Sequence, residues 1–129
     1  MNSESESLQL YLQQIINLSL DGKIPWVQSS PSTLNWNRKT STDHYVVSIQ
    51  KAYNPKFREL EGLGLLKTND KIDYLFQISD KKSASSLLSI SSKDRPEYYS
   101  ALSLIYKSAE KSVDIRASRI LEEILNLPD

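Results

Sequence analysis

His44 and the preceding Asp43 are the first candidates for catalysis, because His44 is the only histidine in the chain. In a Ser-His-Asp triad the histidine accepts the proton of a serine nucleophile. No Gly-x-Ser-x-Gly sequence marks a serine as that nucleophile, and the chain has no cysteine to replace it. We therefore predict no catalytic residue, and we expect His44 on the surface of a hairpin.

The carboxylates are poorly spaced for holding a metal ion. Adjacent Glu122 and Glu123 point about 100° apart on a helix, so they do not converge on one ion. Asp70 and Asp73 lack the glycine and the final glutamate of a calcium loop. Three glycines are also too few for a Gly-rich phosphate loop. The sequence predicts no metal and no cofactor.

Aromatic and basic residues in the first half of the chain allow two interpretations. In one, Trp36, Tyr45, Arg38 and Lys51 line a pocket on a sheet for a nucleotide or another small anion. In the other, Trp26 closes the core beneath the first helix while Trp36 packs across strands, as large aromatic side chains usually do. We favour the second interpretation, in which the tryptophans belong to the core, and keep the ligand pocket as the alternative.

Length and charge limit the class of protein further. The chain of 129 residues fits one domain spanning 1–129, and its 39% hydrophobic content is ordinary for a globular protein. Sixteen basic residues balance 16 acidic ones, which makes nucleic acid an unlikely partner. The polar, acidic start lacks the features of a signal peptide, and no apolar run approaches the roughly 20 residues that span a membrane. We expect a cytoplasmic protein that does not bind membranes.

The pattern of apolar residues predicts an α+β fold. It consists of an antiparallel β-meander of four or five strands, an N-terminal helix, and one long or broken C-terminal helix packed on one face. Asp21-Gly22 should end the first helix, because glycine tolerates the left-handed conformation found there. Residues 53–71 are predicted to be an insertion with a short helix. The expected segments are the helix 3–21 and the strands 23–27, 34–38, 45–49, 72–78 and 87–90, with a loop at 28–33.

The C-terminal third carries the pattern with the most functional interest. Apolar residues recur at intervals of three or four from Tyr98 to Leu127, and one helix of about 30 residues would reach ~45 Å, longer than so small a domain. We predict a break at Val113-Asp114, with Asp114 capping a second helix. Such a break would fold both faces into the core. A continuous helix would instead project an apolar surface suited to a partner helix or a dimer mate, formed by Ile120, Leu121, Ile124 and Leu125.

Three segments together resemble a small bacterial domain of unknown function. They are Leu20-Asp21-Gly22-Lys23-Ile24-Pro25-Trp26 after the first helix, residues 74–80, and residues 98–109 leading into the terminal Leu-rich helix. The resemblance implies a helix, a Gly-x-Ile-x-Trp turn, a meander and a C-terminal helix, and it implies no activity. Glu110-Lys111 stands where the family has a basic pair, and residues 53–71 look like an insertion.

These observations lead to one functional hypothesis and one alternative. The hypothesis is a noncatalytic interaction or regulatory domain that binds another protein, or a second copy of itself, through the C-terminal helix. The alternative is a domain that binds a small ligand or nucleotide at the aromatic and basic residues of the sheet.

Overall fold

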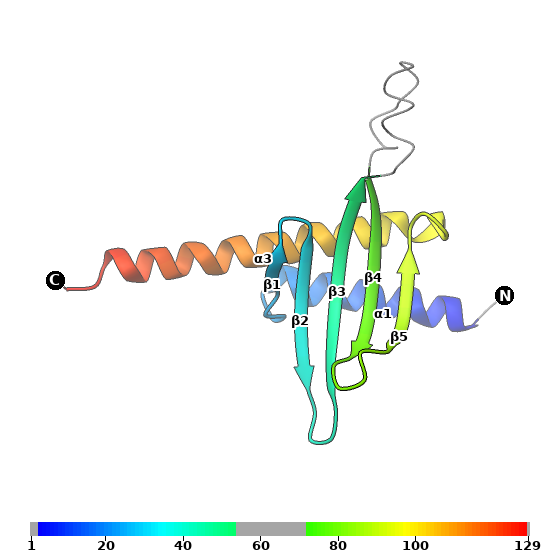
Figure 1. Cartoon of the computed structure of the whole chain (residues 1–129). Helices are drawn as coiled ribbons and strands as arrows, with labels where there is room; N and C mark the ends of the chain where they lie inside the picture. The colour runs from blue at the N-terminus through cyan, green and yellow to red at the C-terminus, as the bar shows by residue number, and fades with distance from the viewer. Residues whose placement is uncertain (1–2, 54–71, 129) are drawn as a thin grey trace, which may run out of the picture.

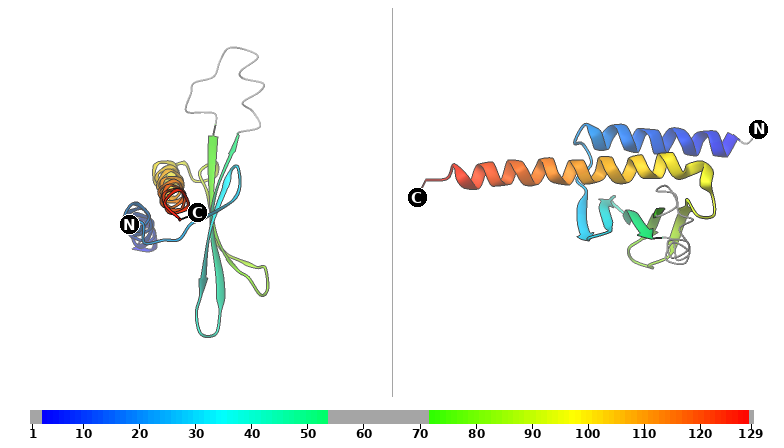
Figure 2. Two further views of the ribbon diagram at one scale, coloured as in Figure 1. Left: turned by 90° about the vertical axis from the view of Figure 1, so that its left-hand side faces the viewer. Right: turned by 90° about the horizontal axis from the view of Figure 1, so that it is seen from above.

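The protein is an antiparallel sheet with two helices stacked on one of its faces (Figures 1 and 2). The computed structural model describes residues 3–53 and 72–128. Helix α3 lies between the sheet and α1, so the molecule has three layers (Figure 2). This arrangement confirms the predicted α+β meander. The elements, in chain order, are α1 (Ser3–Leu20), β1 (Val27–Ser30), β2 (Thr33–Lys39), β3 (His44–Tyr53), β4 (Ile72–Asp80), β5 (Ser86–Ser91), the 3₁₀ turn η2 (Pro96–Tyr98) and α3 (Tyr99–Leu125).

The five strands pair in the order in which they occur along the chain, and each neighbouring pair is antiparallel. Leu34 of β2 pairs with Ile49 of β3, and Ile49 pairs in turn with Phe76 of β4. Phe76 then pairs with Ile90 of β5, which makes one row of buried side chains across four strands. Because side chains alternate between faces, this row fixes which face of each strand meets the helices.

Helix α1 ends at the residues that the sequence predicts. Gly22 has a φ of 72°, and its N–H donates to the carbonyl of Ser19 (3.1 Å). The N–H of Lys23 donates to the carbonyl of Leu18 (2.9 Å), which completes a Schellman motif. The turn directs the chain into the core, where Trp26 is buried and its indole N–H donates to Ser19 Oγ (2.8 Å). Trp26 therefore closes the core beneath the first helix, as expected.

The first strand is placed differently from the prediction. We predicted a strand over 23–27 and a loop over 28–33, but β1 begins at Val27 and continues to Ser30. Residues before it form a tight turn around Pro25, in which the Trp26 N–H donates to the carbonyl of Ile24 (2.9 Å). This turn buries both Ile24 and Trp26, which a regular strand with alternating faces would also do, so the apolar pattern alone is misleading here. The other four predicted strands are confirmed, and the predicted helix within 53–71 lies outside the described residues.

Helix α3 is continuous from Tyr99 to Leu125, so the predicted break at Val113-Asp114 is wrong. The segment contains no glycine or proline, and Asp114 is exposed on the helix surface. Hydrogen bonds hold the helix on both sides of that position. Ser112 Oγ donates to the carbonyl of Ile24 (3.4 Å), and the Arg116 guanidinium donates to the carbonyl of Trp26. With nothing to terminate it, the helix extends beyond the sheet (Figure 1).

Candidate functional site

The first half of α3 has one broad face buried in the domain. Leu102, Ile105 and Ala109 are completely inaccessible to solvent. Tyr106 on the same face turns toward the sheet, where its ring centroid lies 5.8 Å from that of Tyr74. The face continues at a spacing of three or four residues to Val113, which is half-buried against the core. Up to Val113, the apolar residues on this face of α3 are part of the domain's core.

Beyond Arg116 the same helix leaves the body of the protein. All residues from 117 to 127, here called the projecting segment, are exposed, and Figures 1 and 2 show this part of α3 continuing past β1 with no other element beside it. The apolar residues nevertheless continue. Their exposed fractions are 50% at Ile120, 59% at Leu121, 55% at Ile124 and 82% at Leu125. These four residues together with Ala117 are called the apolar stripe.

The projecting segment remains a regular helix to its last turn. Asn126 follows the final helical residue, and its side-chain amide donates to the carbonyl of Glu122 (2.9 Å). The backbone N–H of Asn126 donates to the carbonyls of Glu122 and Glu123. These bonds satisfy carbonyl groups that the end of a helix otherwise leaves unpaired. The apolar stripe is therefore presented on a preformed helix.

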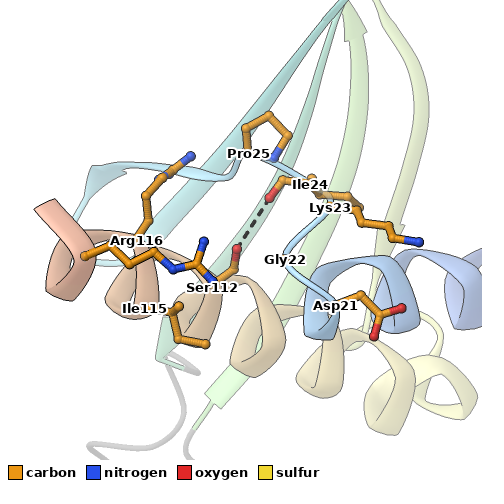
Figure 3. Close-up of a pocket in the computed structure, with 9 residues that line it drawn as sticks. Asp21, Gly22, Lys23, Ile24, Pro25, Ser112, Ile115 and Arg116 are labelled. Carbon is orange, nitrogen blue, oxygen red and sulfur yellow. Dashed lines mark hydrogen bonds between the residues drawn. The ribbon is translucent and has the colours of Figure 1, made fainter.

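A cationic pocket lies at the base of the projecting segment. Its volume is about 350 Å³, and Lys23, Arg116 and Arg119 contribute three cations against the single carboxylate of Asp21. Figure 3 shows Ile115 and Arg116 of α3 on one side and the chain from Asp21 to Pro25 on the other. Such a pocket favours an anionic group, and it was not predicted from the sequence. The sequence places Arg116 and Arg119 three residues apart on one helix. It gives no indication that Lys23, far away in sequence, packs beside them.

The four residues of the predicted ligand pocket do not form one cluster. Arg38 and Tyr45 are direct neighbours across β2 and β3, and Trp36 lies one step along the same face. The Trp36 ring centroid lies 6.1 Å from that of Trp26, which belongs to the turn before β1. Lys51 lies six residues from Tyr45 along β3, about 20 Å away at the rise of a strand. The structure brings three of the four together and places Lys51 at the opposite end of β3.

Lys51 has a different neighbour. Its ammonium nitrogen lies 5.0 Å from the centre of the Tyr106 ring, in a cation–π contact. Burial raises the pKa of Tyr106 and the nearby Lys51 charge opposes that rise. The pKa of Tyr45 is raised chiefly by the negative charge of Asp43. Lys51 thus serves the packing between α3 and the sheet.

Of the residues considered for catalysis or metal binding, Glu122 and Glu123 lie within the projecting segment, and the others lie far from it along the chain. His44 begins β3 at the β2–β3 hairpin, and the Asp43 carboxylate accepts a hydrogen bond from Thr42 Oγ1 (2.9 Å). Across residues 3–53 and 72–128, no three His, Asp or Glu side chains gather closely enough to hold a metal ion. Neither described helix has the length and apolar character needed to cross a membrane.

Comparison with known proteins identifies no relative, since no family model, curated protein or solved structure matches the chain. The resemblance to a small bacterial domain therefore stays a prediction. Among the described residues, the apolar stripe gathers exposed aliphatic side chains on a part of a helix that has no other element beside it.

Proposed function

We propose that this chain is a noncatalytic domain that binds another protein molecule through the apolar stripe. The observation that supports this proposal is the change in exposure along one face of α3. That face is fully buried at Leu102 and Ala109, half-buried at Val113, and open to solvent at Ile120 and Ile124. A helix that keeps its apolar spacing beyond its own domain is suited to packing against a second molecule.

The energetics favour association at this surface. Burying an exposed leucine or isoleucine side chain contributes roughly 1.5–3 kcal/mol. The apolar stripe places four such side chains within two turns of a helix that has no other element beside it, whereas the exposed Leu10 and Tyr11 lie on α1, which packs along α3. Because the helix is already formed, binding does not have to order the backbone, which lowers the entropic cost of association.

A site-specific photo-crosslinking experiment tests the proposal. A photoreactive amino acid replaces Leu125 in one variant and Leu10 in a control, because both leucines are highly exposed on helices. We expect irradiation in the cells that make the protein to yield a discrete protein adduct at position 125 and none at position 10. Equal labelling at the two positions, or no adduct at position 125, would refute a protein partner at the apolar stripe.

The alternative function, binding of a small anion or nucleotide, has narrower support. Arg38 and Tyr45 face each other across two strands beside Trp36, which offers one cation and two aromatic rings. A thermal-shift screen against nucleotides and sugars tests this alternative, since a ligand that binds the folded state raises the melting temperature. A shift that Arg38→Ala abolishes would support it, and an unchanged melting temperature with every ligand would count against it.

A further inference from the structure

The cationic pocket at the base of the projecting segment has walls that the fold holds in place. One wall is the turn from Asp21 to Pro25, and the other is a face of α3 (Figure 3). The Schellman motif at Gly22 fixes the path of the turn as it leaves α1. Ser112 Oγ on α3 donates to the carbonyl of Ile24 (3.4 Å), which joins the two walls. The pocket is therefore formed before any ligand arrives.

The lining of the pocket has positive charge that the protein does not neutralise. Lys23, Arg116 and Arg119 provide three cations and Asp21 provides one carboxylate, so the net charge of the lining is +2. Across residues 3–53 and 72–128, none of these three cations lies within ion-pair distance of a carboxylate. This holds also for Glu123, which follows Arg119 by one helical turn. The lining therefore attracts an anion, and a dianion matches its net charge.

The two arginines of the lining favour a phosphoryl group over a carboxylate. The Arg116 guanidinium donates to the carbonyl of Trp26, which holds the side chain at the edge of the pocket. A guanidinium has five N–H donors arranged in a plane, so donors remain for a ligand. Guanidinium groups bind phosphate oxygens through two parallel hydrogen bonds. A phosphate ester carries a charge of about −1.5 to −2 at pH 7, whereas a carboxylate carries a single negative charge.

The pocket is larger and more apolar than a free phosphate ion requires. Its volume of about 350 Å³ lies at the lower end of the range of roughly 300–1,000 Å³ that is typical of pockets for small organic molecules. Ile24, Pro25 and Ile115 add apolar groups to the lining. We infer that the cationic pocket binds a small organic phosphate, whose phosphoryl group contacts the cations and whose compact apolar part contacts these three residues.

This site is separate from the apolar stripe and from the alternative ligand site on the sheet. At 100° per residue, Arg119 and Ile124 point about 140° apart on α3, so a ligand in the pocket leaves the apolar stripe open. The pocket shares no residue with the cluster of Trp36, Arg38 and Tyr45. A failure of the pocket to bind phosphate therefore leaves both the proposed function and its alternative standing.

Titrations of the full chain, followed by the NMR signals of its backbone amides at constant ionic strength, test the inference. The compounds are phenyl phosphate, inorganic phosphate, benzoate and phenol. Phenyl phosphate combines a dianion with an apolar ring, and each of the others lacks the ring, the second charge or all charge. We expect saturable shifts at Gly22, Lys23 and Ile115, with phenyl phosphate at least about tenfold tighter than inorganic phosphate or benzoate. Phenol should give no saturable shift.

Substitutions of opposite sign test the same pocket. Arg119→Gln should weaken binding of phenyl phosphate about tenfold, because it removes charge-assisted hydrogen bonds from an exposed side chain that has no partner among the described residues. Lys107→Gln removes the same charge from an exposed position of α3 outside the pocket, and the affinity should not change. Asp21→Asn removes the carboxylate of the lining and should strengthen binding about threefold, whereas Asp114→Asn, outside the pocket, should not.

Each outcome decides one part of the inference. Inorganic phosphate that binds as tightly as phenyl phosphate would overturn the organic ligand and assign the pocket to free phosphate. Benzoate that binds as tightly as phenyl phosphate would overturn the phosphoryl group. The site itself is overturned if neither phosphate gives saturable shifts at the pocket, or if Arg119→Gln and Lys107→Gln weaken binding equally.

Discussion

Leu121→Asp combined with Leu125→Asp should weaken association through the apolar stripe by at least about 100-fold, close to 2.8 kcal/mol, while the domain stays folded. Two carboxylates in an apolar interface must lose their water without gaining partners, which is costly. Both side chains project into solvent in the isolated chain, so the free energy of unfolding should change by no more than about 0.5 kcal/mol. Sedimentation velocity of the fluorescently labelled protein, over a range of concentrations of an extract of the cells that make it, measures association, and urea unfolding measures stability.

A matched control for this result is Leu10→Asp combined with Leu104→Asp. These two leucines are also exposed on helices, and the change in net charge is the same, but neither lies on the projecting segment. We expect the control variant to associate as the unmodified protein does. If the two double variants lose association equally, the effect comes from added charge in general, and the apolar stripe has no special role.

Trp26→Ala should destabilise the domain by about 3–5 kcal/mol, the usual cost of removing a large buried aromatic side chain. Trp26 is fully buried, and its indole N–H donates to Ser19 Oγ at the end of α1. The substitution opens a cavity between α1 and the sheet and removes that hydrogen bond. Urea unfolding followed by far-ultraviolet circular dichroism measures the loss, since the fluorescence signal changes with the tryptophan.

Trp36→Ala is the comparison for this prediction. Trp36 packs against Trp26 but is only half-buried, so less apolar surface is lost and the cavity is open to water. We expect a clearly smaller loss of stability than for Trp26→Ala. An equal or larger loss of stability for Trp36→Ala would contradict the interpretation that Trp26 is a central core residue and Trp36 lies at the edge of the core.

The sequence predicts most of the fold because its apolar residues have regular spacing. The alternation in β3 and β4 places Ile49 and Phe76 on the buried face, and Gly22 marks the end of α1 unambiguously. The start of β1 was placed incorrectly because Ile24 and Trp26 alternate like a strand although they belong to a turn. Conversely, Val27–Ser30 is mostly polar and exposed at every position, so it lacks the apolar alternation by which strands are recognised.

The residues of the apolar stripe could be predicted from the sequence, but their exposure to solvent could not. Their spacing in the sequence identifies four apolar residues on one helix, Ile120, Leu121, Ile124 and Leu125. Whether these side chains are exposed depends on whether α3 bends. We predicted a break because Asp114 is able to cap a helix, yet local capping preference does not outweigh the hydrogen-bond pattern of an uninterrupted helix. The cationic pocket with Arg116 was missed because it arises from contacts between segments about 90 residues apart in sequence.

Hydrogen exchange in the projecting segment, measured for the dilute purified protein and for the protein in an extract of the cells that make it, tests most directly whether the apolar stripe is covered by a second molecule. An isolated helix end with no neighbouring element exchanges its backbone amides rapidly, because it opens locally at little cost. We expect the amides from Ala117 to Leu125 to become protected in the extract, while those of the sheet stay unchanged. Identical exchange in the two samples would show that these side chains stay in contact with water and would contradict binding of another protein molecule through this surface.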